Sequence, residues 1–357
     1  MRHLVLLSLL TATLSLLLAA EPAPVGVDAL PPGDVAKAIA AVKESYVRPQ
    51  ALSDAEMERA TLQGLLDRLA PEVSLVTGTT SAEPASAFYS EDYRGTGYLR
   101  LGELTAENVS KAGQALKDWN GKSVGAVVVD LRGTPASSDY DAAADVARLF
   151  CTKGTEMFSL APGKAAASSP AATAPAAVTY SATADPIFQG VLVVLVAGST
   201  AEAAEAVAAC LQKCAKALVV GDRTGGRAFE YRDYPFSGAV LRVAVARVIL
   251  PDGKEPGEEG LKPDIDVPPG PAPKQDLMRS VTMNGVGSVI EEHDLPHLNE
   301  AALVAGNNPE VDELEAEAAG KKPETRIIDR QLQRALDMVT SIAVFQAKKS
   351  PGPDTGE

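Results

Sequence analysis

One segment of the sequence, VLVAGSTAEAAEAVAACLQKCAKALVVGDRTGGR, carries side chains that could form the active site of a hydrolase. An apolar strand runs into the corner Gly198-Ser199-Thr200, and a helix and a second strand follow. Corners between a strand and a helix expose the nucleophile in many hydrolases, so Ser199 and Thr200 are candidate nucleophiles. Glu202 and Arg227 add an acid and a permanent cation to the same segment.

A histidine base for Ser199 could come from His293 or His297, which lie far along the chain. A triad would need their loop to fold over the corner. The two histidines could also bind a metal, but Pro296 would break a helix that aligned them, and two ligands are too few. A solvated loop is the simpler interpretation. We therefore expect neither a metal nor a cofactor.

The corner belongs to an alternation of strands and helices, which predicts an α/β core with helices covering a sheet. Continuous or alternating apolar runs predict strands at 97–101, 125–132, 191–197 and 217–221, and a hairpin from 229–234 and 240–248. Helical spacing covers 34–47, 53–69, 105–119, 141–150 and 201–215. We expect residues 75–95 to be irregular and residues 161–179 to form a long loop.

Asp130 and Arg132 end a buried strand at the carboxyl edge of this sheet. Ligands bind at that edge in α/β proteins, so both side chains are candidate binding residues. A purely structural ion pair is the other explanation. The sequence leaves both open.

Composition limits the partners and the location of the chain. It has 357 residues, 46% of them hydrophobic, and a formal net charge of -14, which argues against binding to nucleic acid. A basic start and an apolar run before Ala20 are typical of a signal peptide, and the run is short for an integral membrane span. We expect cleavage near Ala20 and a secreted or periplasmic protein.

The three cysteines are Cys151, Cys210 and Cys214. Export would permit a disulfide, but Cys210 and Cys214 lie one helical turn apart, a poor geometry for bridging. Cys151 could bridge to either of them. Small buried thiols are the alternative that we favour.

Six segments occur in the order found in the C-terminal processing peptidases, also called tail-specific proteases. They are GLLDRLAPEVS (64–74), VVVDLRGTPAS (127–137), VLVVLVAGSTAEAAEAV (191–207), ALVVGDRTGGR (217–227), GLKPDIDVP (260–268) and DRQLQRALDMV (329–339). Each is weak alone, but six in order are specific. The chain thus resembles this family over about residues 36–268 and 325–345. The resemblance implies a crotonase-like α/β core, a serine nucleophile and a lysine general base.

The chain departs from the family at the residues that carry the chemistry. A gapless comparison puts Glu202 at the nucleophile, Arg227 at the lysine and Tyr231 at a glutamine of the family pattern. An arginine, with a pKa above about 12, cannot act as a general base. A carboxylate is a poor replacement for an alkoxide, so the expected dyad is missing. No lysine lies between Lys216 and Lys254 to take the family's base position.

Two further departures concern the oxyanion hole and substrate recognition. Pro135, Ala136 and Ser137 stand where the family has Pro-Gly-Gly, and the loss of one oxyanion donor costs about 2.7–4 kcal/mol of transition-state stabilisation. The family usually carries a PDZ domain before its core. Residues 75–95 are too few for one.

The sequence leaves open which groups the Glu202 side chain contacts. Glu202 and Arg227 could form an ion pair where serine and lysine meet in an active relative. Ser199-Thr-Ala-Glu202 also reads as a capping box, in which Glu202 caps its own helix. The two interpretations are compatible.

We divide the chain into six parts: a signal peptide (1–20), an N-terminal helical region and linker (21–95), a protease-like core (96–268), a Pro-rich and acidic insertion (269–324), a closing helix (325–347) and a disordered tail (348–357). The main hypothesis is an exported, inactive homologue that binds an extended peptide or envelope protein, with Asp130, Arg132, Gly198 and Gly226 as binding residues.

The alternative is an active serine-type endopeptidase with a rearranged site, using Ser199 or Thr200 and the segment 135–137. A third possibility is a crotonase-like enzyme of another class, but no cofactor motif in the sequence supports it. The oligomeric state is left open.

Overall fold

The computed structural model describes residues 27–77, 86–163, 176–257, 259–291 and 327–349. The chain divides into two compact units, Met1–Asp67 and Arg68–Glu357, and each is described by itself. The described part of the first unit holds η1 (Val27–Ala29), α1 (Pro32–Ser45), η2 (Pro49–Leu52) and most of α2 (Asp54–Leu69). Neither α1 nor α2 buries a residue.

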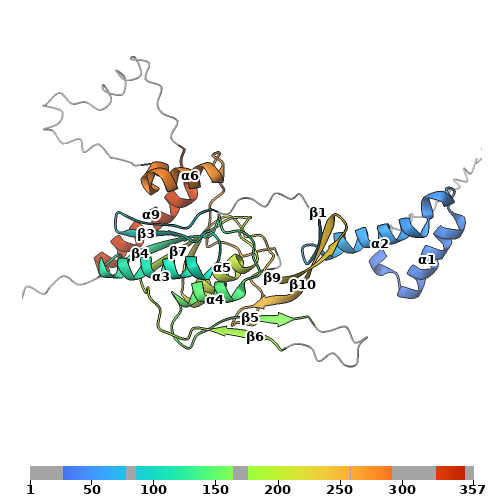
Figure 1. Ribbon diagram of the computed structural model, residues 1–357, viewed down its shortest axis with the longest axis horizontal. Helices are drawn as coiled ribbons and strands as arrows, with labels where there is room; N and C mark the ends of the chain where they lie inside the picture. The colour runs from blue at the N-terminus through green and yellow to red at the C-terminus, as the bar shows by residue number, and fades with distance from the viewer. Residues whose placement is uncertain (1–26, 78–85, 164–175, 258, 292–326, 350–357) are drawn as a thin grey trace, which may run out of the picture. The chain divides into compact units, whose positions relative to one another are not determined.

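A six-stranded sheet forms the centre of the second unit (Figure 1). Its order is β11-β8-β7-β4-β3-β2, and all neighbours are parallel except β2 and β3. The strands are β2 (Tyr89–Tyr93), β3 (Thr96–Arg100), β4 (Ala126–Asp130), β7 (Val191–Val196), β8 (Leu218–Gly221) and β11 (Ile265–Asp266).

Helices cover both faces of this sheet (Figure 1). One face packs on α3 (Ala106–Gly121), α4 (Tyr140–Arg148) and α5 (Ala203–Cys214), and the other on α6 (Lys274–Asn284), η3 (Val286–Val289) and α9 (Arg330–Lys349). Val127 and Val129 point into the first core and Val128 into the second. Because successive strand residues face opposite sides, a continuous apolar run fills both cores.

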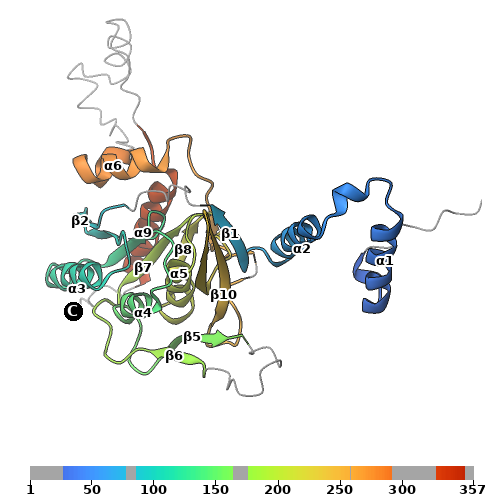
Figure 2. The same cartoon turned by 45° about the vertical axis from the view of Figure 1, so that its right-hand side comes forward.

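A second, antiparallel sheet is built around the long strand β10 (Ala239–Ile249), as Figure 2 shows. β10 pairs with β1 (Val73–Thr77), β9 (Phe229–Phe236) and β5 (Glu156–Pro162), and β5 pairs with β6 (Val178–Ser181). The β9–β10 hairpin turns at Gly238, whose φ of 80° suits glycine. This sheet carries Arg242 to the edge of the parallel sheet.

The predicted α/β core, its strands and the β9–β10 hairpin are confirmed. The expectation that residues 75–95 are irregular is wrong at both ends, where β1 finishes and β2 begins. α6 and η3 lie inside the predicted insertion 269–324, and α9 runs two residues into the predicted tail. The predicted loop 161–179 is wrong at its two ends, which belong to β5 and β6. The predicted signal peptide (1–20), residues 164–175 of that loop and residues 292–326 lie outside the described residues.

Among the helices that the structure describes, none combines the length and the apolar character needed to cross a membrane.

Candidate functional site

Four segments meet at the carboxyl edge of the parallel sheet. They are the loop 131–138 after β4, the turn 197–202 between β7 and α5, the segment 222–228 after β8, and the start of α6. In a doubly covered sheet this edge is where strand ends leave a crevice. The site is therefore built where the fold class puts one.

Glu202 occupies the bend that leads into α5. Its φ is 53° and its ψ is −125°, a backbone that non-glycine residues rarely adopt. A strained turn that leads into a helix is the geometry that holds a hydrolase nucleophile. Glu202, which the sequence comparison predicts at the nucleophile position, thus lies on an elbow-like bend and presents a carboxylate.

The capping-box interpretation of Glu202 is wrong. α5 begins at Ala203, after Glu202, and the Glu202 side chain makes no capping hydrogen bond. Ser199 lies before the bend, and its Oγ donates to the carbonyl of Arg132 at 3.1 Å. The positive φ of Glu202 separates Ser199 from the helix, so the two cannot cap one another.

Glu202 pairs with Arg242 and not with Arg227. Its Oε1 lies 3.2 Å from a guanidinium nitrogen of Arg242, and the Ser138 hydroxyl donates to its Oε2 at 3.4 Å. Arg227 contributes its carbonyl, which accepts from the Glu202 N–H at 3.1 Å. The predicted ion pair with Arg227 is therefore wrong, because β10 brings another arginine to the carboxylate. Burial raises the pKa of Glu202, against the lowering effect of Arg242.

The main-chain N–H that follows Glu202 has a partner within the protein. In a nucleophile elbow, the N–H that follows the nucleophile is one of the oxyanion donors. Here that N–H belongs to Ala203, and it donates to the carbonyl of Ser137 at 3.0 Å. This N–H is therefore already bonded within the protein.

Asp130 and Arg132 form a buried charge network with Asp329. Arg132 donates to both oxygens of Asp130 and to both oxygens of Asp329. The Tyr98 hydroxyl donates to Asp130, and Gln331 accepts from Arg132. Burial alone would raise the pKa of Asp130, but the charge and hydrogen bonds of Arg132 hold it below 3.8. The geometry supports the structural ion pair, because every acceptor of Asp130 faces protein.

Glu205 holds the segment that carries Arg227. This carboxylate is fully buried and accepts from the N–H groups of Gly226, Arg227 and Leu261 and from the Thr224 hydroxyl. The N–H of Gly226 is therefore committed within the protein, which argues against Gly226 as a ligand contact. Glu205 lies in the segment 191–207, which resembles the family, but no role was predicted for it.

Thr200 and Tyr231 also have structural partners. Thr200 is buried, its Oγ1 donates to the Leu131 carbonyl, and it accepts from the Ala197 N–H. The Tyr231 hydroxyl donates to the Pro71 carbonyl, and the Arg242 guanidinium lies 4.8 Å from its ring centre. Burial, followed by the charge of Glu202, raises the pKa of Tyr231 to about 12. Neither hydroxyl is placed as a nucleophile.

Ser199 meets a lysine that sequence analysis missed. The Nζ of Lys274 donates to the Ser199 Oγ at 3.0 Å and to the Arg132 carbonyl at 3.1 Å. Lys274 is the first residue of α6, after Pro273, and lies 75 residues beyond Ser199. Lys274 was missed because it lies in the predicted insertion. Pro273, which precedes it, is a residue type that often marks the start of a helix.

A cavity of about 600 Å³ opens beside these groups. Of the residues singled out from the sequence, its lining includes Arg132, Pro135, Ala136, Ser199 and Arg227. The other candidates lie outside the lining: Glu202, Ser137, Asp130, Thr200, Tyr231, Gly198 and Gly226.

The cysteines are free thiols. Cys151 and Cys210 are buried, with their sulfur atoms 3.9 Å apart, which is too far for a disulfide bond of about 2.05 Å. Within the described ranges, no group of three or more His, Cys, Asp or Glu residues could hold a metal ion. His293 and His297 lie outside these ranges.

The sequence model of peptidase family S41 matches residues 95–267, which include the elbow, the β4 loop and Arg227. The chain contains an S41 peptidase domain. The matched range contains Glu202 and Arg227, which the sequence comparison predicts to stand at the positions of the family's serine and lysine.

Two curated relatives each match about half of the chain. The chain is 29% identical over 180 residues to a carboxyl-terminal-processing protease of Picosynechococcus, covering 49% of this chain and 40% of that protein. It is 28% identical over 213 residues to the chloroplastic C-terminal processing peptidase of Tetradesmus obliquus, covering 58% and 43%. The chain thus spans less than half the length of these curated relatives.

Solved structures give weaker likenesses. A photosystem II D1 C-terminal processing protease matches with a TM-score of 0.42 and 24% identity, over 60% of this chain and 53% of that one. A putative peptidase from Parabacteroides merdae matches with a TM-score of 0.47 and 15% identity, over 64% and 79%.

Proposed function

We propose that this S41-domain protein is exported and binds an extended peptide or envelope protein without cleaving it. One observation carries the proposal: the elbow presents Glu202, whose carboxylate is buried and paired with Arg242. A carboxylate committed to an arginine cannot form the acyl intermediate that a serine forms.

Two neighbouring groups support the proposed absence of peptidase activity. Arg227 cannot act as a general base, since a guanidinium stays protonated at working pH. The Ala203 N–H, which would stabilise an oxyanion, is bonded to Ser137. A groove of this kind can still hold an extended chain through main-chain and side-chain contacts.

The test is to incubate the pure protein with a labelled unfolded protein, such as β-casein, and to measure binding by anisotropy and cleavage by electrophoresis. We expect binding without cleavage. Binding with cleavage that co-purifies with the wild-type chain would disprove the inactive part of the proposal. An absence of binding would disprove the proposed peptide binding.

Restoring the two family residues should not restore activity. In the double variant Glu202→Ser, Arg227→Lys, the Ala203 N–H remains bonded to Ser137, and one missing oxyanion donor costs about 2.7–4 kcal/mol. We expect no turnover of the unfolded substrate above the wild-type level. The single variants serve as controls. Robust turnover would show that the 131–138 loop still supplies a working oxyanion hole.

The contact between Ser199 and Lys274 favours a second candidate function, a serine-type endopeptidase with a rearranged site. A neutral lysine within hydrogen-bond distance of a serine could accept its proton. This candidate predicts that a fluorophosphonate probe labels Ser199, and that Ser199→Ala or Lys274→Met abolishes labelling, while Ser137→Ala does not. We expect no labelling above the Ser199→Ala background. Strong labelling that depends on both residues would favour the peptidase over the binding module.

A further inference from the structure

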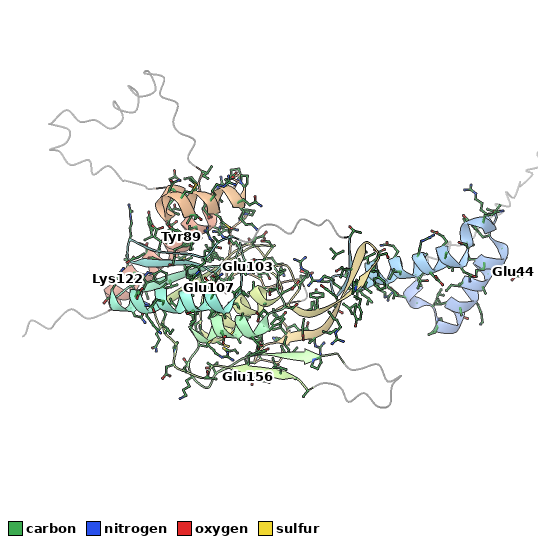
Figure 3. All side chains as sticks on the ribbon, viewed as in Figure 1. Glu44, Tyr89, Glu103, Glu107, Lys122 and Glu156 are labelled. Atoms are coloured by element: carbon green, nitrogen blue, oxygen red, sulfur yellow. The ribbon has the colours of Figure 1, made fainter. Side chains whose placement is uncertain are left out.

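The cavity beside the elbow is lined by six cationic side chains. They are Arg100, Arg132, Arg227, Arg242, Lys274 and Arg279, and no aspartate or glutamate belongs to the lining. The chain as a whole has the opposite sign, with a formal net charge of -14. Glu103, Glu107 and Glu156, labelled in Figure 3, are exposed residues outside this cavity. The lining of this cavity is therefore opposite in sign to the chain as a whole.

Three of the six cations have carboxylate partners among the residues that the structure describes: Arg279 lies 3.7 Å from Asp276, and Arg132 and Arg242 have two partners each. Arg132 is bonded to Asp130 and Asp329. Arg242 is bonded to Glu202 and to Asp233. With two carboxylate partners each, neither Arg132 nor Arg242 requires an anion from outside.

Arg100 and Arg227 are not balanced in this way. Arg100 is 1% exposed, and its guanidinium donates to the carbonyls of Ala87 and Met278 and to the Thr282 hydroxyl. The ring of Tyr89 lies 5.4 Å from it. All of these partners are neutral. Within the described ranges, Arg100 has no carboxylate at ion-pair distance.

Arg227 is exposed at the mouth of the site, and its side chain makes no hydrogen bond or ion pair with the part of the chain that the structure describes. Its main chain is fixed by the bond from its N–H to Glu205 at 2.8 Å. The charge of Arg227 also acts on Glu202, where it opposes the rise in pKa caused by burial. With its backbone fixed and no side-chain hydrogen bond to break, the guanidinium can still reach a ligand.

A third polar group in the lining lacks a partner. Thr134 is 3% exposed, and its Oγ1 is buried without a hydrogen-bond partner among the described residues. An unsatisfied buried hydroxyl costs free energy, and a native structure usually supplies its partner. Thr134 lines the same cavity as the two unbalanced arginines.

We propose that this cavity binds a carboxylate group carried by the extended peptide, with Arg227 as its main contact, Arg100 supplying buried positive charge and Thr134 a hydroxyl. The inference rests on the proposed function, because it names the ligand chemistry of the same site. A planar guanidinium matches the two oxygens of a carboxylate. A volume of about 600 Å³ is within the range of ligand sites. The carboxylate can come from the peptide's C-terminus or from an acidic side chain.

The experiment uses the full chain and three labelled ten-residue peptides of alanine, serine and threonine. One has neutral side chains and a free C-terminal carboxylate. The second has two glutamates and an amidated C-terminus, and the third has glutamines in their place and the same amide. We expect at least one carboxylate peptide to bind about tenfold more tightly than the third peptide. The peptide that binds more tightly than the third one identifies the source of the carboxylate.

Arg227→Gln should remove most of this difference, and Arg232→Gln, an exposed arginine five residues on and outside the cavity lining, should leave it unchanged. Equal binding of all three peptides would overturn the inference and leave the proposed function standing. A loss of the same size in both variants would also overturn it. Binding of none of the peptides would count against both the inference and the proposed function.

Discussion

Arg132→Met should lower the free energy of unfolding by about 3–5 kcal/mol, because it leaves two buried carboxylates without their cation. Asp130 and Asp329 are 0% and 3% exposed and share the guanidinium of Arg132. The network joins the end of β4 to the start of α9, so the closing helix should loosen as well. Equilibrium unfolding in urea at pH 7 measures the loss.

Arg247→Met is the matched control for Arg132→Met. Arg247 pairs with Glu255 at 3.3 Å on an exposed part of β10, and such pairs contribute about 0–1 kcal/mol. The difference between the wild type and Arg132→Met should also depend on pH. The pKa of Asp130 is lowered in the folded state, so its contribution is present above pH 3.8 and is lost as the pH falls through the folded pKa. A loss below about 1 kcal/mol at pH 7 would contradict the network's role.

Glu205→Ala should have the second largest effect, about 3 kcal/mol of unfolding free energy. The substitution removes one acceptor from three backbone N–H groups and a hydroxyl, and a buried donor left unsatisfied costs about 1–3 kcal/mol. Hydrogen exchange should show where the structure opens: the amides of Gly226 and Arg227 should exchange faster than in the wild type. The affinity for the peptide should also fall, because the backbone of Arg227 is no longer held by Glu205.

Glu103→Ala controls for the loss of a carboxylate, since Glu103 is exposed and its side chain makes no hydrogen bond in the part of the chain that the structure describes. It should change stability by less than about 0.5 kcal/mol. Unchanged exchange at Gly226 and Arg227 in Glu205→Ala would show that other contacts hold the segment.

The core of the fold could be predicted because its strands are local and strongly patterned. The run at 126–130 is apolar on both faces, as a strand between two helical layers requires. β2 was missed because YSEDY has three polar residues between its tyrosines, and the strand half-buries Glu91 together with Tyr89 and Tyr93 at the edge of the sheet. β1 was missed because it forms only by pairing with β10, which lies far along the chain.

The candidate site was predictable where spacing along the chain decides it. The gapless segments predict that Glu202 and Arg227 replace the family's serine and lysine, and this stays a prediction. The partners of these residues were not predictable in the same way. Arg242 reaches Glu202 from a hairpin, and Lys274 reaches Ser199 from a helix in the expected insertion. Such contacts depend on how separate elements pack, which periodicity does not record.

The bend at Glu202 has a consequence for how such a domain can change over time. Two main-chain bonds, from Glu202 N–H to the Arg227 carbonyl and from Ala203 N–H to the Ser137 carbonyl, hold it in place. Neither bond involves the side chain at position 202. The contour of the backbone is therefore independent of the side chain at this position, so a single substitution there can change the chemistry of the bend without rebuilding the scaffold.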